Sequence, residues 1–121
     1  MSHEILRLPA DPAEALAVLR ATSLHVPVLV FKKSPICHTS RETEAELSEW
    51  LSKRPADLPL MLAEVDVIAE RMLARGLASL LAIRHESPQA LLFKHGELAW
   101  HGSHGQLNVA RFQAEVDGQR A

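Results

Sequence analysis

The stretch that decides the fold runs from residue 25 to residue 40 and reads His25-Val26-Pro27-Val28-Leu29-Val30-Phe31-Lys32-Lys33-Ser34-Pro35-Ile36-Cys37-His38-Thr39-Ser40. Its first part, His25–Phe31, is almost continuously apolar, which is typical of a short strand buried on both faces of a helix-covered sheet. The next part, Lys32–Ile36, predicts a loop, and Thr39–Ser52 is rich in helix formers. Cys37 therefore stands between a core strand and the start of a helix.

Helices and strands are predicted to alternate on both sides of this stretch. A helix covering Pro12–Arg20 comes first, because Asp11 suits the N-cap and proline suits the first helical position. The later predicted elements are a strand at Leu60–Val67, a helical stretch at Ala69–Ala82, strands at Gln89–Phe93 and Glu97–Trp100 joined by a short hairpin connection, and a helix at Asn108–Val116. This order predicts one α/β domain over residues 1–121, with a mixed four-stranded sheet and helices on both faces.

The composition of the chain narrows its class. The 121 residues suffice for one domain, and 47% of them are hydrophobic. The 13 basic and 15 acidic side chains give a net charge of -2, so we expect no nucleic acid or membrane surface as partner. No signal peptide and no long apolar run is visible, and a single cysteine forbids an intrachain disulfide. We therefore expect a cytoplasmic protein.

Cys37 is the first candidate for chemistry. A helix N-terminus carries unpaired N–H groups and about half a positive charge, which together favour a thiolate over a thiol. The thiolate is the form of cysteine that attacks disulfides. Ser40 completes a C-x-x-S spacing and offers a hydrogen bond, and His38 adds positive charge when it is protonated. Spacing alone leaves two interpretations open, a reactive thiol or a cysteine packed as a small apolar side chain; the polar neighbours Ser34 and Thr39 favour the first.

The seven histidines raise the question of a metal site. His101 and His104 are three residues apart, a spacing that places two side chains on one face only in a helix. This pair follows a predicted strand and contains Gly102, and zinc needs three or four ligands. We therefore expect no bound metal, and hydrogen-bonded or surface histidines instead.

A second group of residues lies around a proline. Ser87-Pro88 stands in a turn just before the strand Gln89–Phe93. On its own this proline is most simply a trans residue entering a strand, because only about 5–6% of X-Pro bonds in folded proteins are cis.

The order of these elements resembles the thioredoxin fold. More narrowly, Val30–Ser34 leading to Cys37 resembles the YtxJ family, the monothiol bacilliredoxins of the bacillithiol system. The more specific match is the run from 85 to 98, His-Glu-Ser-Pro-Gln-Ala-Leu-Leu-Phe-Lys-His-Gly-Glu-Leu, which continues through Trp100 to His104. The resemblance covers roughly residues 26 to 108. The family usually has proline directly after its cysteine, a position that His38 occupies here.

The resemblance implies a reaction, the removal of bacillithiol from mixed disulfides on protein cysteines. Cys37 would be the catalytic thiolate and would carry bacillithiol as a mixed disulfide, with bacillithiol as co-substrate and no other cofactor. Pro88 would be the cis-proline beside the thiol, and the backbone of Ser87 would pair with the substrate strand. His38 and Ser40 would complete the substrate site. Since the chain has one cysteine, a low-molecular-weight thiol or a disulfide reductase would have to regenerate it.

Two alternatives remain open. One is the same reaction with glutathione or another small thiol. The other is a thioredoxin-like binding module, in which Cys37 and histidines hold a metal or an iron–sulfur cluster without redox turnover. The helical stretch at Ala69–Ala82 also has two interpretations, a core helix or a contact in a dimer, so the oligomeric state stays open.

Overall fold

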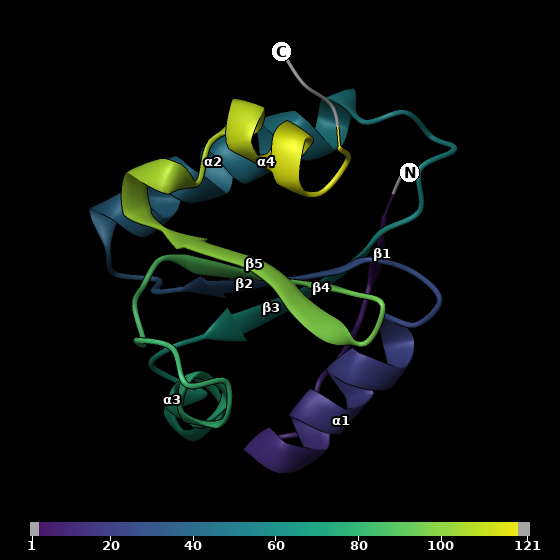
Figure 1. Cartoon of the computed structure of the whole chain (residues 1–121). Helices are drawn as coiled ribbons and strands as arrows, with labels where there is room; N and C mark the ends of the chain where they lie inside the picture. The colour runs from purple at the N-terminus through teal and green to yellow at the C-terminus, as the bar shows by residue number, and fades with distance from the viewer. Residues whose placement is uncertain (1–2, 119–121) are drawn as a thin grey trace.

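A computed structural model describes residues 3–118 of the chain and shows a mixed sheet between two layers of helices (Figure 1). The strands are β1 (Glu4–Ile5), β2 (Val28–Lys33), β3 (Met61–Asp66), β4 (Gln89–Lys94) and β5 (Glu97–Ser103). The helices are α1 (Pro12–Thr22), α2 (His38–Lys53), α3 (Arg71–Leu80), the 3₁₀ turn η1 (His104–Gln106) and α4 (Val109–Glu115).

Over residues 3–118 the sheet has five strands in the order β1-β3-β2-β4-β5, so the predicted number of four is wrong by one. The additional strand, β1, contains only two residues and is exposed on the edge, where it pairs with β3 in parallel. Two residues carry no readable periodicity, which explains why the sequence did not predict this strand.

The central strand β2 pairs in parallel with β3 and antiparallel with β4. Its alternate side chains enter two separate cores. Val28 and Val30 point toward α1 and α3 below the sheet, and Leu29 and Phe31 point toward α2 and α4 above it (Figure 1). Burial on both faces is the reason that this strand shows no polar alternation in its apolar part.

Strand β2 starts later and ends later than predicted. Pro27 lies outside it, and Lys32 and Lys33 belong to it rather than to a loop. Lys32 has no exposed surface, whereas Lys33 forms ion pairs on the opposite face of the sheet. A strand can include lysines when each ammonium group has a partner, and those partners are distant in sequence.

Helix α3 is a core helix, as one of the two interpretations had it. Leu73 and Leu77 are buried against α1 and the sheet, while Met72 and Leu80 remain exposed. Gly76 permits the close approach of α1, because a Cβ atom at this position would lie 2.3 Å from Pro12 Cγ.

The end of α2 is fastened to the segment after α4 by a buried ion pair. Arg54 Nη2 lies 2.8 Å from Asp117 Oδ1, and the two side chains are 1% and 2% exposed. Trp50 donates from Nε1 to Asp117 Oδ2 at 2.9 Å and stacks on Phe112. Within residues 3–118, no helix has the length and apolar character needed to cross a membrane.

Candidate active site

The thiol of Cys37 lies at the N-terminus of the longest helix, as predicted. Cys37 is the N-cap of α2, with an extended backbone (φ -98°, ψ 126°), and its side chain is partly exposed. Its carbonyl accepts the hydrogen bond of Arg41 N, so α2 begins directly after it. The thiol therefore faces the unpaired amides of the first helical turn.

Those amides lower the pKa of the Cys37 thiol. The largest cause is the hydrogen bond from the backbone N–H of Ser40, and the backbone N–H of Thr39 and the two hydroxyl groups act in the same direction. Partial burial of the sulfur opposes them. Hydrogen bonds to the charged form stabilise the thiolate, which is the nucleophilic form.

Ser40 also fixes the loop before the thiol. Its side chain is buried at 1% exposure, and its Oγ accepts a hydrogen bond from the backbone N–H of Ser34 at 3.1 Å. The same hydroxyl can donate its hydrogen to the sulfur. Ser40 Oγ thus holds the loop at Ser34, directly after β2, and also acts on the thiol.

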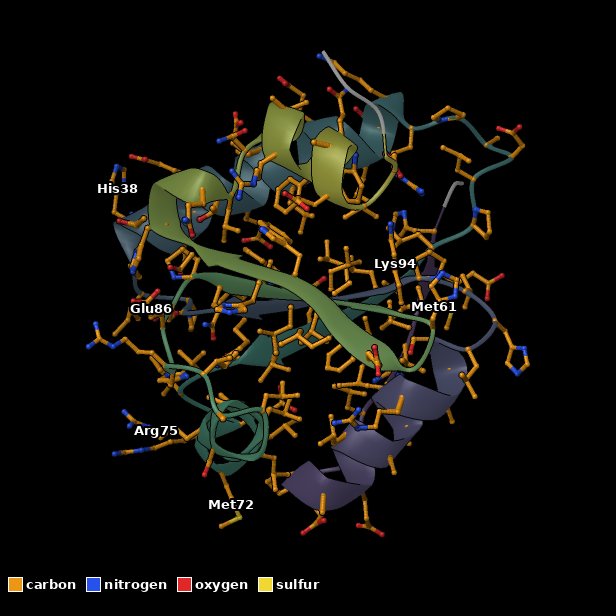
Figure 2. The ribbon with its side chains drawn as sticks, in the orientation of Figure 1. His38, Met61, Met72, Arg75, Glu86 and Lys94 are labelled. Atoms are coloured by element: carbon orange, nitrogen blue, oxygen red, sulfur yellow. The ribbon has the colours of Figure 1, made fainter. Side chains whose placement is uncertain are left out.

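His38 lies at the site but is engaged elsewhere. Its side chain is 77% exposed, and Nε2 lies 2.7 Å from Glu42 Oε1 one turn along α2. Figure 2 shows His38 at the outer end of the helix, directed away from the sheet. A glutamate at this distance competes with the thiolate for any positive charge on the imidazole.

Lys33 fastens α2 to the sheet near the thiol. Its Nζ lies 2.9 Å from Glu44 Oε2 on α2 and 2.7 Å from Glu64 Oε2 on β3. Hydrogen bonds to Glu64 and then to Glu44 raise the pKa of Lys33, so it stays charged and paired. The helix that carries Cys37 is in this way tied to two strands.

The bond between Ser87 and Pro88 is cis, which confirms the prediction made from the resemblance. Gln89, the next residue, pairs with Lys32 in the register of β2 and β4. The turn before β4 and the loop from β2 to Cys37 therefore lie at the same end of these two strands. Pro88 is buried, and its carbonyl accepts a hydrogen bond from the backbone N–H of His104 at 3.2 Å. Among the described residues, Ser87 Oγ is one of three buried side-chain atoms without a hydrogen-bond partner.

Sequence reasoning missed a polar cluster behind this turn. Lys32 Nζ donates to Gln89 Oε1 at 2.6 Å, and the hydroxyl of Ser103 donates to Glu86. That hydrogen bond is the main cause of the lowered pKa of Glu86, with the charge of His104 contributing. The available signal was a lysine directly after an apolar strand, together with the polar residues of the run from 86 to 89.

Two hollows lie near α2. One of about 200 Å³ opens between Thr39 in the first turn of α2 and His104 in η1, beside the predicted site. A larger one of about 530 Å³ lies between α2 and β1, and none of the predicted site residues lines it. In the part of the chain from 3 to 118, no three His, Cys, Asp or Glu side chains are grouped to hold a metal.

A partly exposed thiol at a helix start, with a cis-proline at the same end of the sheet, defines a thiol–disulfide oxidoreductase of the thioredoxin fold. Solved structures share this fold. A protein with a thioredoxin fold, described as a candidate oxidoreductase, is 26% identical with a TM-score of 0.71, over 94% of this chain and 93% of that one. Desulfothioredoxin from Desulfovibrio vulgaris Hildenborough is 19% identical with a TM-score of 0.64, over 94% and 97% of the two chains. Thioredoxin O2 from Arabidopsis thaliana is 21% identical with a TM-score of 0.64, over 99% and 96%.

The family is narrower than the fold. The family described as monothiol bacilliredoxin BrxC matches residues 11–112. The chain belongs to this family, and its role is in thiol redox chemistry.

Proposed function

We propose that this protein removes bacillithiol from mixed disulfides on protein cysteines, with Cys37 as the only redox-active group. The observation that carries the proposal is the lone, partly exposed thiol whose pKa is lowered by the amides of α2. The family match supports the choice of bacillithiol as the small thiol.

The reaction starts when the Cys37 thiolate attacks the bacillithiol sulfur of a mixed disulfide on a client protein. The bond between the two sulfur atoms of the client disulfide breaks, and the client cysteine leaves as a thiolate. A bond forms between Cys37 Sγ and the bacillithiol sulfur. No net oxidation occurs in this exchange, because one disulfide replaces another.

Regeneration requires a second molecule, since the chain has no other cysteine. The thiolate of a second bacillithiol attacks the bacillithiol sulfur on Cys37, which releases the Cys37 thiolate and bacillithiol disulfide. A separate reductase then reduces that disulfide. These free thiols persist in a reducing compartment, so the proposal places the protein in the cytoplasm.

The substrate site would combine the turn at Ser87 and Pro88 with the start of α2. The backbone of Ser87 and the ring of Pro88 would hold the client polypeptide, and Ser40 and His38 would face the bacillithiol side of the disulfide. The hollow of about 200 Å³ between Thr39 and His104 offers room for the small-thiol portion.

The test uses a model protein with one cysteine, loaded either with bacillithiol or with glutathione. Wild-type protein is expected to release the bacillithiol adduct faster than the glutathione adduct, and intact-mass spectrometry is expected to find bacillithiol on Cys37. The Cys37→Ser variant is the matched control and should do neither. Equal behaviour of wild type and Cys37→Ser would refute the redox function, and preference for glutathione would refute the assigned thiol.

A further inference from the structure

Lys32 is an unusual feature of the core. It has no exposed surface, although lysine is rarely buried without a compensating partner. Burial, reinforced by the charge of Arg75 on α3, lowers the pKa of Lys32 to about 8, and the charge of Glu86 acts in the opposite direction. His85 is the other titratable group near it. Keeping an ammonium group here costs free energy, which suggests that its contact has a use.

The contact of Lys32 is the side-chain amide of Gln89. Lys32 Nζ donates to Gln89 Oε1 at 2.6 Å, and Gln89 itself is 2% exposed. The amide then reaches the preceding turn twice. Its Nε2 donates to the carbonyl of Arg84 at 2.9 Å, and its Oε1 accepts from the backbone N–H of Glu86 at 3.4 Å.

The same turn is held from its other side. The carboxylate of Glu86 accepts from the hydroxyl of Ser103 at the end of β5, and the carbonyl of Pro88 accepts from His104 N. Figure 2 shows Glu86 at one end of the sheet, opposite the end where Lys94 lies. The segment from 84 to 88 is therefore clamped between β2 and the start of η1.

We propose that Lys32 and Gln89 are positioning residues that set the geometry of the segment from 84 to 88 for binding the polypeptide half of the mixed disulfide. This inference rests on the proposed function. Lys32 and Gln89 point to the α3 face of the sheet, whereas the groups that polarise the Cys37 thiol belong to the first turn of α2. Positioning of the segment from 84 to 88 and stabilisation of the Cys37 thiolate therefore use different atoms.

This separation predicts a split between two measurable rates. Disturbing the pair should slow disulfide exchange with a peptide, because the peptide contacts the segment from 84 to 88. It should not change the alkylation of Cys37 by iodoacetamide, because a small reagent needs only the thiolate. A residue that only stabilises the fold would leave both rates unchanged in the folded fraction.

The test compares Gln89→Glu, Lys32→Met and the control Lys94→Met. Gln89→Glu removes the donor to the Arg84 carbonyl. It keeps an acceptor for the buried ammonium group of Lys32, so this variant is expected to fold even if Lys32→Met does not. Lys94 lies at the far end of β4, where its Nζ donates to the Glu115 carbonyl at 3.1 Å. The readouts are the half-saturating concentration of a bacillithiol-modified peptide, the maximal exchange rate and the alkylation rate as a function of pH.

Gln89→Glu and Lys32→Met are expected to raise the half-saturating peptide concentration roughly tenfold, the effect of about one lost hydrogen bond. The pH midpoint of alkylation should match that of wild type, and Lys94→Met should be unchanged in both assays. The inference is overturned if the wild type exchanges normally and Gln89→Glu binds peptide as well as Lys94→Met does. It is also overturned if alkylation slows in parallel with exchange. Failure of the wild type to exchange at all would instead refute the proposed function.

Discussion

Asp117 offers the sharpest test of how the helix that carries the thiol is held in place. Its carboxylate accepts hydrogen bonds from Arg54 Nε at 3.0 Å, Arg54 Nη2 at 2.8 Å and Trp50 Nε1 at 2.9 Å. Asp117→Ala removes all three acceptor contacts, whereas the hydrogen bond from Arg54 Nη1 to the Leu58 carbonyl at 3.1 Å remains.

Breaking a buried ion pair by removing one partner costs about 3–5 kcal/mol. The three hydrogen bonds are not added separately, because they share one carboxylate. Small domains have about 5–15 kcal/mol of total stability, so the variant loses a large part of it. We expect the midpoint of thermal unfolding to fall by about 10–20 °C for a chain of this length.

The assay is urea unfolding followed by tryptophan fluorescence, together with a thermal melt. Glu115→Ala is the matched control, because its ion pair with Arg111 is exposed (34% and 45%) and such pairs contribute about 0–1 kcal/mol. The folded fraction of Asp117→Ala should alkylate Cys37 at the wild-type rate, since Cys37 and Arg54 flank opposite ends of α2. A loss no larger than that of Glu115→Ala would refute the reasoning.

Three further predictions concern Ser40 at the site and Asp66 at the end of β3. Ser40→Ala removes a hydroxyl that bonds the thiolate and Ser34 N, so the pH midpoint of Cys37 alkylation should move upward; an unchanged midpoint would show that the hydroxyl is irrelevant. Ser40→Cys restores a C-x-x-C spacing, so a small thiol on Cys37 should be expelled as an internal disulfide forms, which intact mass detects as loss of the adduct; a persistent adduct would argue against the proximity of the two side chains. Asp66 accepts from the backbone amides of Ala69 and Ile68, and these bonds lower the pKa of its carboxyl from the ordinary aspartate value. The folded state therefore binds this proton more weakly than the unfolded chain, so the stabilisation is fully present above the ordinary pKa of aspartate and is lost as the pH falls through the lowered pKa of the folded state. Asp66→Asn should lower stability at pH 7 and flatten its decline in acid, and an unchanged pH profile of unfolding would contradict this.

Local patterns predicted most of the fold. The apolar run in β2, the N-cap Asp11 before α1 and the helix formers of α2 each depend on residues close together in the chain. The predicted boundaries were wrong where distant residues decide them. Strand β2 reaches Lys33 because Gln89 and Glu64 provide partners for its two lysines.

The sequence predicted some features of the site, and other contacts became visible only in the structure. The position of Cys37 at a helix start and the cis bond at Pro88 followed from the sequence and its resemblance to a family. The contact of His38 with Glu42 was not predicted and became visible only in the structure, and the place of His38 in the substrate site stays a prediction. The hydrogen bond between Lys32 and Gln89 was not predicted at all.

The sequence by itself determined the reactive group. It has one cysteine, at the start of a helix, and no second thiol to resolve a mixed disulfide. The local backbone is enough for this, because the amides that stabilise the thiolate lie within three residues of it. Only the tertiary structure decided which residues hold the turn before β4. Antiparallel pairing of β2 with β4 brings residues more than fifty positions apart into hydrogen-bond contact, and the buried Lys32 then binds Gln89, whose amide holds the turn at residues 84–86.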